Sequence, residues 1–197
     1  EIFSVPKKFG PTVNLTGSSG ARDKDGAWSP DGKKIAYISD TDGEYQVYII
    51  DASHPKAAIK LTNFKDGYRH TLKWSPDGKK IGFTDQTLKL YYINVSDKKL
   101  VEVDQAEYEN IDVSLDLKPI FDYSWSPDSR WLAYVKMNEQ SVYQIYIYSL
   151  ESRKKQRVSQ ELFNDSNPVF SKDGHFLYFI SNRRFSPTYG DLEWEMV

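Results

Sequence analysis

The sequence contains no cysteine among its 197 residues. Without a thiol, the chain cannot form a disulfide bond, a thiolate metal site or a cysteine nucleophile. Because many cytoplasmic and many exported domains also lack cysteine, this absence leaves the compartment open between cytoplasm and periplasm. The three histidines, His54, His70 and His175, do not have the spacing of metal ligands. We therefore expect neither a metal ion nor another cofactor.

Long apolar runs and a dominant charge sign are also missing. No apolar run approaches the roughly 20 residues that a membrane-spanning helix needs. The formal net charge is −2, so no strong positive field would attract nucleic acid or anionic lipid. The sequence has neither a phosphate-binding glycine loop nor the G-x-S-x-G turn of an α/β-hydrolase. We expect no membrane span, no nucleic-acid partner and no catalytic residue within this chain.

The sequence does contain a ten-residue pattern that occurs four times. It reads W-S-P-D-G-K-K-I-A-Y from Trp28, returns from Trp74 and Trp125, and closes in a weaker copy from Phe170. The copies begin 46, 51 and 45 residues apart. A period of about 40–50 residues is typical of repeat architectures. The shared structural positions are Trp28, Pro30, Asp31 and Gly32; Trp74, Pro76, Asp77 and Gly78; Trp125, Pro127 and Asp128; and Phe170, Asp173 and Gly174.

Each copy predicts a chain reversal inside a four-stranded antiparallel meander. Proline presets the φ angle of a turn, aspartate tolerates or caps it, and glycine takes the position with positive φ. In the first unit, strands are expected just before Trp28 and at 34–39, 45–51 and 58–62, with His54-Pro55 ending the third strand. The other expected strands are 72–75, 80–85, 89–95 and 99–104; 122–126, 131–137, 143–150 and 156–159; 168–171 and 175–181; and 1–5 and 12–16.

The face pattern of these strands predicts an all-β propeller built of four-stranded antiparallel blades. Ile35 and Tyr37 point to one face of their strand, while Ala36 and Ile38 point to the other. A sandwich sheet would show one polar outer face. Since both faces are apolar, each sheet needs neighbours on both sides, as blades around an axis have. We expect Trp28 to pack between blades.

We expect one partial propeller domain over residues 1–197, cut from a longer chain because it begins at Glu1 rather than methionine. Propellers typically have four to eight blades. Two half-blades could pair to close a four-bladed ring, but both end segments would then fill the same strand position. An open arc of about four blades of a larger ring is therefore favoured. The expected units are 1–20, the end of a preceding blade; 21–66; 67–104; 105–160; and 161–197, an incomplete blade.

The third unit carries an acidic insertion, residues 105–120, before its innermost strand. It contains Glu107, Glu109, Asp112 and Asp116. Connections of this kind open onto one mouth of the ring, and propeller loops often carry function. A solvated acidic loop is the simpler interpretation.

A second set of candidates consists of residues just before each innermost strand, which would surround the same mouth. Their mixture of charge and aromatic rings suits contact with a peptide or a small polar ligand. Hydrogen bonding between blades is the simpler structural interpretation. The channel-mouth candidates are Arg22, Asp23, Tyr68, Arg69, His70, Asp122, Tyr123, Asp165 and Asn167.

These repeats resemble those of a known family. W-S-P-D-G-K followed by an Ile-Ala-Tyr strand is similar to the tricorn-type and Tol-type propeller repeat. Residues 1–6, 14–16, Arg22 and 27–32 resemble the start of the second propeller of tricorn-like proteases. A later blade of that propeller is resembled by residues 178–183, Phe185, Pro187, Tyr189 and 191–193. The resemblance implies a large oligomeric serine peptidase that degrades oligopeptides. In that family a six-bladed and a seven-bladed propeller precede PDZ-like and α/β catalytic parts.

The resemblance further implies that this chain is about four of the seven blades of a gated passage or filter toward the active site. The family's catalytic serine and histidine lie in later domains, so no position here takes their roles. The implied partners are the remaining blades and catalytic domains, peptide substrates and further copies of the chain. Two alternatives stay open: a Tol-type protein-binding propeller without a peptidase, and the propeller cap of a prolyl-oligopeptidase-like hydrolase.

Overall fold

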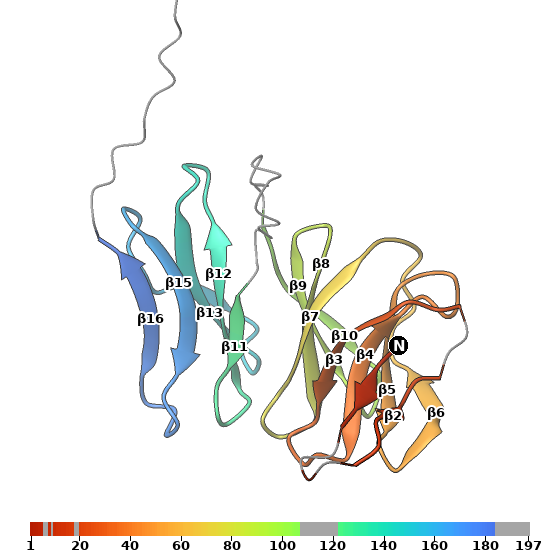
Figure 1. Ribbon diagram of the computed structural model, residues 1–197. Coiled ribbons are helices and arrows are strands. Elements are labelled where there is room, and N and C mark those ends of the chain that lie inside the picture. The colour runs from red at the N-terminus through yellow and green to blue at the C-terminus, as the bar shows by residue number, and fades with distance from the viewer. Residues whose placement is uncertain (6–7, 9, 18–19, 107–121, 184–197) are drawn as a thin grey trace, which may run out of the picture.

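Figure 1 shows the computed structural model of the chain, which describes all residues except 6–7, 9, 18–19, 107–121 and 184–197. The described part consists of β-strands and their connections, without a helix. All strand pairs are antiparallel, and the strands form three sheets of four and two sheets of two. The predicted all-β class and the four-stranded meanders are confirmed.

Each complete blade is a meander whose strands follow one another in chain order. The first blade contains β3 (Asp23–Trp28), β4 (Lys34–Ser39), β5 (Gln46–Asp51) and β6 (His54–Lys60). The second contains β7 (Arg69–Trp74), β8 (Lys80–Asp85), β9 (Lys89–Asn94) and β10 (Leu100–Gln105). The third contains β11 (Tyr123–Trp125), β12 (Trp131–Met137), β13 (Tyr143–Ser149) and β14 (Lys155–Arg157).

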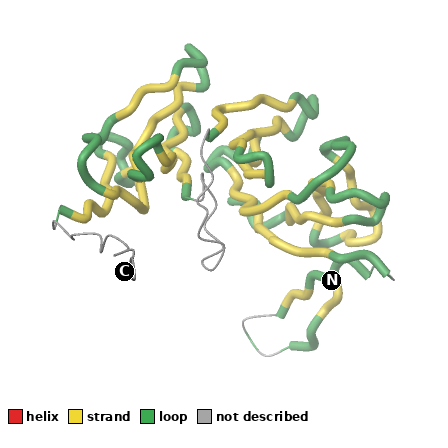
Figure 2. The backbone as a smooth tube through the Cα atoms, turned by 90° about the horizontal axis from the view of Figure 1, so that it is seen from above, coloured by secondary structure: helices red, strands yellow, loops and turns green. Residues whose placement is uncertain are grey.

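Two-stranded sheets flank the three blades. β1 (Phe3–Ser4) pairs with β2 (Val13–Asn14), and β15 (Asn164–Phe170) pairs with β16 (Leu177–Asn182). Figure 2, seen from above, shows the sheets as separate blades along an arc. β3 lies beside β7 of the next blade, and β15 lies beside β11, β12 and β13 of the third blade. The first strands of neighbouring blades are therefore in contact, and β15 also packs against the face of the third blade.

Three strands begin earlier than predicted. β7 begins at Arg69 rather than at residue 72, and β15 begins at Asn164 rather than at 168. Six channel-mouth candidates therefore lie within first strands and not just before them: Asp23, Arg69, His70, Tyr123, Asp165 and Asn167.

The fourth strand of the first blade begins at His54, not at residue 58, and Pro55 lies inside it. His54 pairs with Asp51 directly across a tight turn. Because β6 is an edge strand, the N–H that proline lacks is not required by a further strand. The fourth strand can therefore begin at His54-Pro55, directly after the turn.

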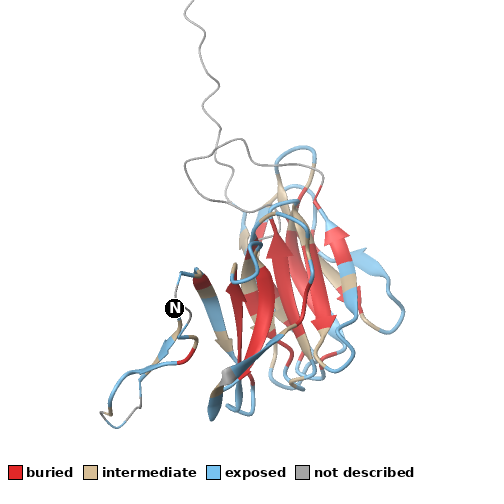
Figure 3. Ribbon diagram, turned by 90° about the vertical axis from the view of Figure 1, so that its right-hand side faces the viewer, coloured by how far each residue is buried: buried red, intermediate tan, exposed pale blue. Residues whose placement is uncertain are grey.

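Apolar side chains fill the seams between blades. The first and second blades share a core that includes Val47 and Phe83, and the second and third share one that includes Tyr92 and Tyr134. β1 and β2 cover the other face of the first blade, where Leu15 is buried. Figure 3 shows these buried strands at the centre of the molecule. Both faces of the central blades are thus covered, as the face pattern predicts.

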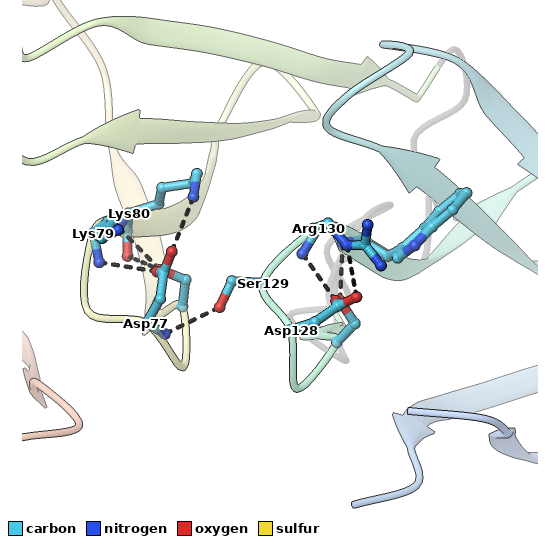
Figure 4. A network of polar contacts seen from close by, with 9 residues as sticks. Asp77, Lys79, Lys80, Asp128, Ser129 and Arg130 are labelled. Atoms are coloured by element: carbon cyan, nitrogen blue, oxygen red, sulfur yellow. Dashed lines mark hydrogen bonds and ion pairs between the residues drawn. The ribbon is translucent and has the colours of Figure 1, made fainter. Parts of the chain in front are cut away.

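The Ser-x-Asp turns repeat one hydrogen-bonded arrangement in all four copies. Each serine hydroxyl donates to the aspartate Oδ1 at 2.5–2.6 Å and accepts the N–H five residues after the serine. The fourth turn residue has positive φ, and in the third copy this residue is Ser129, at 60°. Figure 4 shows that the Asp77 N–H donates to Ser129 Oγ, at 3.0 Å. This bond links the turns of the second and third blades.

The repeated tryptophan joins the second blade to the first and the third blade to the second. Trp74 Nε1 donates to the Ala27 carbonyl at 2.9 Å, and Trp125 Nε1 donates to the Lys73 carbonyl at 3.1 Å. Both rings are buried, whereas Trp28 is 52% exposed. The prediction that Trp28 packs between blades is therefore wrong. In the described residues, the sheet before the first blade has only β1 and β2, without a first strand to receive the ring.

Candidate functional site at the strand-start rim

The arc has two rims of different character. At the strand-start rim the first strands β3, β7, β11 and β15 begin, and the hairpins that join second to third strands return there because the strands are antiparallel. The opposite turn rim carries the four Ser-x-Asp turns. The channel-mouth candidates all lie at or near the strand-start rim, so this rim is the candidate functional site.

The first strands share a bulge near this rim. The register shifts between Lys24 and Ala27, between His70 and Lys73, and between Ser166 and Val169. A bulge bends a strand and changes the direction of its side chains. The residues with positive φ at these bulges are Asp25 (53°), Thr71 (57°) and Asn167 (54°). Five residues before the repeated aromatic position, Asp23, Arg69 and Asp165 occupy equivalent places, and all three are buried.

Two of the candidates lie in the seam between the second and third blades. Lys73 Nζ donates to the Tyr123 carbonyl at 2.6 Å and lies 3.7 Å from Asp122 Oδ1. The Tyr123 hydroxyl donates to the Thr71 carbonyl at 2.5 Å, and burial raises the pKa of this hydroxyl well above its ordinary value. A Cβ on Gly82 would lie 2.8 Å from the Tyr123 ring, so glycine leaves the space that the ring fills. These residues join blades.

Five residues from both sides of the first seam form a rim cluster. Its members are Lys24, Tyr45, Phe64, Tyr68 and Arg69. The Tyr45 and Tyr68 ring centroids are 5.3 Å apart, and Lys24 Nζ lies 4.9 Å from the first and 5.6 Å from the second. A cation at this distance is attracted by the electron-rich ring faces. Tyr68 is 51% exposed, so the outer part of the cluster faces solvent.

Arg69 forms the floor of the rim cluster and is 2% exposed. Its guanidinium stacks on the Phe64 ring at 3.7 Å and donates to the carbonyls of Asp66 and Tyr68. Its Nε has no hydrogen-bond partner. Burial lowers the pKa of Arg69, although the charge of Asp85 opposes this shift. The cluster thus holds a buried positive charge under an aromatic pair, in which Tyr68 is exposed and Tyr45 is half-buried.

The remaining candidates are spread along the rim. The Arg22 side chain is exposed, and its N–H donates to Asp40 Oδ1 at 2.7 Å. His70 is half-buried, and Asn167 is exposed. The Asp165 carboxylate is buried, and its Oδ1 has no hydrogen-bond partner. The structure therefore brings Tyr68 and Arg69 into one cluster and leaves the other candidates in separate blades or seams. The acidic insertion lies mostly outside the described residues.

Sequence reasoning did not identify Lys24, Tyr45 and Phe64 as parts of this site. Tyr45 begins a predicted strand, and Lys24 directly follows a candidate residue, but neither position marks contact across a seam. Within the described ranges, no three histidine, aspartate or glutamate side chains are grouped to hold a metal ion. The same ranges contain no helix long and apolar enough to cross a membrane. The chemistry that this rim offers is reversible contact through rings, cations and hydrogen bonds.

Comparison with known proteins adds to this geometry. The family model described as the tricorn protease second beta propeller domain matches residues 1–197. A protein of Sulfurisphaera tokodaii, named as a tricorn-like protease C-terminal subunit, is 30% identical over 95% of this chain and 20% of its own length. The chain thus spans about a fifth of that relative.

Two solved structures show a similar fold. The crystal structure of the tricorn protease matches with a TM-score of 0.72 at 19% identity, over 90% of this chain and 16% of that one. TolB from Acinetobacter baumannii matches with a TM-score of 0.65 at 20% identity, over 93% of this chain and 43% of that one. At such identities the likeness concerns the fold alone. The predicted fragment of a larger propeller is confirmed.

Proposed function

Because this chain belongs to the family of tricorn protease second β-propeller domains, we propose that it contacts and selects peptides on their way to a peptidase site elsewhere in the parent chain. The observation that carries this proposal is the family match over residues 1–197. The chain is a propeller portion of a tricorn-like protease. Its role in passage and assembly, and the parent's action on oligopeptides, are parts of the proposal.

The rim cluster is the part of the chain that we assign to peptide contact. Tyrosine rings provide a large contact surface and lose little conformational entropy, because they have only two side-chain torsions. Lys24 adds a cation that can attract a carboxylate of a passing peptide. A passage requires contacts that are favourable enough for entry and weak enough for release. The exposed Tyr68 ring, stacked beside Tyr45 and next to one lysine, meets both requirements.

The experiment compares Tyr68→Ala with Tyr68→Phe in the parent protein. Substrates are a fluorogenic tripeptide and a 15-residue peptide with the same reporter. We expect Tyr68→Ala to raise KM for the long peptide about three- to tenfold, as expected for an aromatic contact, without changing kcat for the tripeptide. Tyr68→Phe keeps the ring and should behave like the wild type. The isolated 197-residue chain should hydrolyse neither substrate.

Equal kinetics of Tyr68→Ala and wild-type protein on the long peptide would reject the assignment to the rim cluster. Turnover by the isolated chain after rigorous purification would reject the non-catalytic role. The alternatives from the sequence differ in the region that the parent chain carries after these blades. A peptidase region with a PDZ-like part supports the proposal. A chain ending after six blades supports a Tol-type role, and an α/β-hydrolase domain supports a propeller cap.

A further inference from the structure

Two hydrogen bonds join the third and fourth strands of the first blade near the strand-start rim. The N–H of Val47, at the start of the third strand, donates to the Thr62 hydroxyl at 2.8 Å. The Val47 carbonyl accepts the Leu61 N–H at 2.8 Å. The third blade has both bonds at the equivalent positions, each at 2.9 Å. This pair of bonds is thus shared by two of the three complete blades.

The small sheet of β1 and β2 has the same pair of bonds. The Ile2 N–H donates to the Thr16 hydroxyl at 3.1 Å, and the Ile2 carbonyl accepts the Leu15 N–H at 2.8 Å. β1 and β2 also come directly before the first strand β3, as the last two strands of one blade come before the next blade. They therefore have the positions of a third and a fourth strand, and the described strands include no first and second strand for their blade.

The absent strands leave one edge of β1 open. In each complete blade, the third strand pairs with the second on one edge and with the fourth on the other. β1 pairs only with β2, so within the described ranges its other edge has no partner. An open edge presents backbone N–H and C=O groups to which a further strand can pair.

Trp28 lies open on the face of the first blade that β1 and β2 partly cover. It has the same register in its blade as Trp74 and Trp125 have in theirs. Those two donate to Ala27 and Lys73, in each case the carbonyl directly before the tryptophan of the preceding blade. Trp28 is 52% exposed, and none of the described residues accepts a bond from its Nε1. By the same register, its acceptor would belong to the absent first strand.

We propose that an antiparallel pair of strands from another part of the parent chain docks here and completes the blade of β1 and β2. Its second strand pairs with the open edge of β1. Its first strand accepts the Trp28 Nε1 bond on the carbonyl directly before its own aromatic position. The strands β15 and β16 of the same copy cannot fill this place, because they lie at the other end of the arc (Figures 1 and 2). The chain matches 20% of its tricorn-like relative, so a parent of that kind has ample chain to supply the pair.

The first test follows the oxidation of tryptophan side chains in the parent protein by hydroxyl radicals, with mass spectrometry of the peptides. Trp74 is the buried reference. Trp131 is the exposed reference, since it is 38% exposed and lies in a blade that already has a neighbour on each side. We expect Trp28 to be oxidised as slowly as Trp74 and several-fold more slowly than Trp131. A Trp28 that reacts as fast as Trp131 would overturn the proposal.

The second test removes the N–H and keeps an aromatic ring. We expect Trp28→Phe and Trp74→Phe to lower the Tm of the propeller in the parent protein by similar amounts, about 2–4 °C, as for one lost hydrogen bond. The matched control Trp131→Phe should leave Tm unchanged. If Trp28→Phe behaves like Trp131→Phe, no strand accepts the bond and the proposal fails. The oxidation measurement needs no substitution and decides the matter if a variant does not fold.

A second copy of the chain is the other candidate occupant, because β15 and β16 are themselves a first and a second strand. In that case Trp28 would lose its protection when the protein is diluted to monomers, and this result would overturn the proposal. Protection that persists in the monomer supports strands from the same parent chain. None of these measurements involves a peptide, so they are independent of the proposed role in passage.

Discussion

The two rims of the arc differ in how closely their residues and hydrogen bonds repeat from blade to blade. At the turn rim, one serine–aspartate arrangement recurs four times with nearly the same distances. At the strand-start rim, equivalent positions carry different side chains, such as Asp23 and Arg69. Repetition thus marks what every blade needs in order to fold. Variation marks positions where a blade can change its side chains and keep its fold.

The largest effect should come from the seam that lies between the rims. Tyr123 was a channel-mouth candidate, but the structure places its ring in full burial between two blades. We expect Tyr123→Ala to lower the free energy of unfolding by about 3–5 kcal/mol, since a large buried side chain is lost. Tyr123→Phe should cost only about 1 kcal/mol, through the bond to the Thr71 carbonyl. Urea unfolding measures the free energy of unfolding of both variants. A small effect of Tyr123→Ala would contradict the structural role and favour the channel-mouth interpretation of this residue.

A smaller effect is expected when the repeat is made more regular. Gly82 stands where the other complete blades have Ala36 and Ala133, and an added Cβ would meet the Tyr123 ring at 2.8 Å. We expect Gly82→Ala to destabilise the chain by about 1–3 kcal/mol through overpacking. In a Tyr123→Ala background the same change should cost little, because the ring is gone. Thermal unfolding of the four proteins tests this coupling, and additive effects would contradict it.

The smallest effect concerns acid at the turn rim. The hydrogen bond from the Ser126 hydroxyl, and to a lesser extent the one from Arg130, lower the pKa of Asp128 to about 2. Because this pKa is lowered in the folded protein, the ionised carboxylate stabilises the fold at pH values above the pKa of the unfolded chain, near 4. This stabilisation is lost as the pH falls toward 2. We expect Asp128→Asn to remove up to about 1 kcal/mol at pH 6, as for an exposed hydrogen bond, and almost nothing at pH 2. Unfolding curves at pH 6, 4, 3 and 2 would show the difference closing, and a constant gap would refute it.

Much of the fold could be predicted because its signals are local. The strands at 80–85 and 131–137 match the structure residue for residue, since turn residues bound them and apolar residues fill them. The start of β6 was predicted wrongly from Pro55. A proline is tolerated there because β6 is an edge strand, and this depends on the arrangement of the sheet rather than on the local sequence. Two of the five rim-cluster residues, Tyr68 and Arg69, were predicted; Lys24 and Tyr45 were missed because they contact Tyr68 across a seam.

The tryptophan bonds between blades also set a direction. Trp74 donates to a carbonyl of the blade before it, and Trp125 does the same one blade later. Each acceptor therefore belongs to the part of the chain that leaves the ribosome first. Domains synthesised earlier generally fold earlier, and repeat units are stabilised mainly by their neighbours. At these two seams, the blade that supplies the acceptor is therefore translated before the tryptophan that binds it.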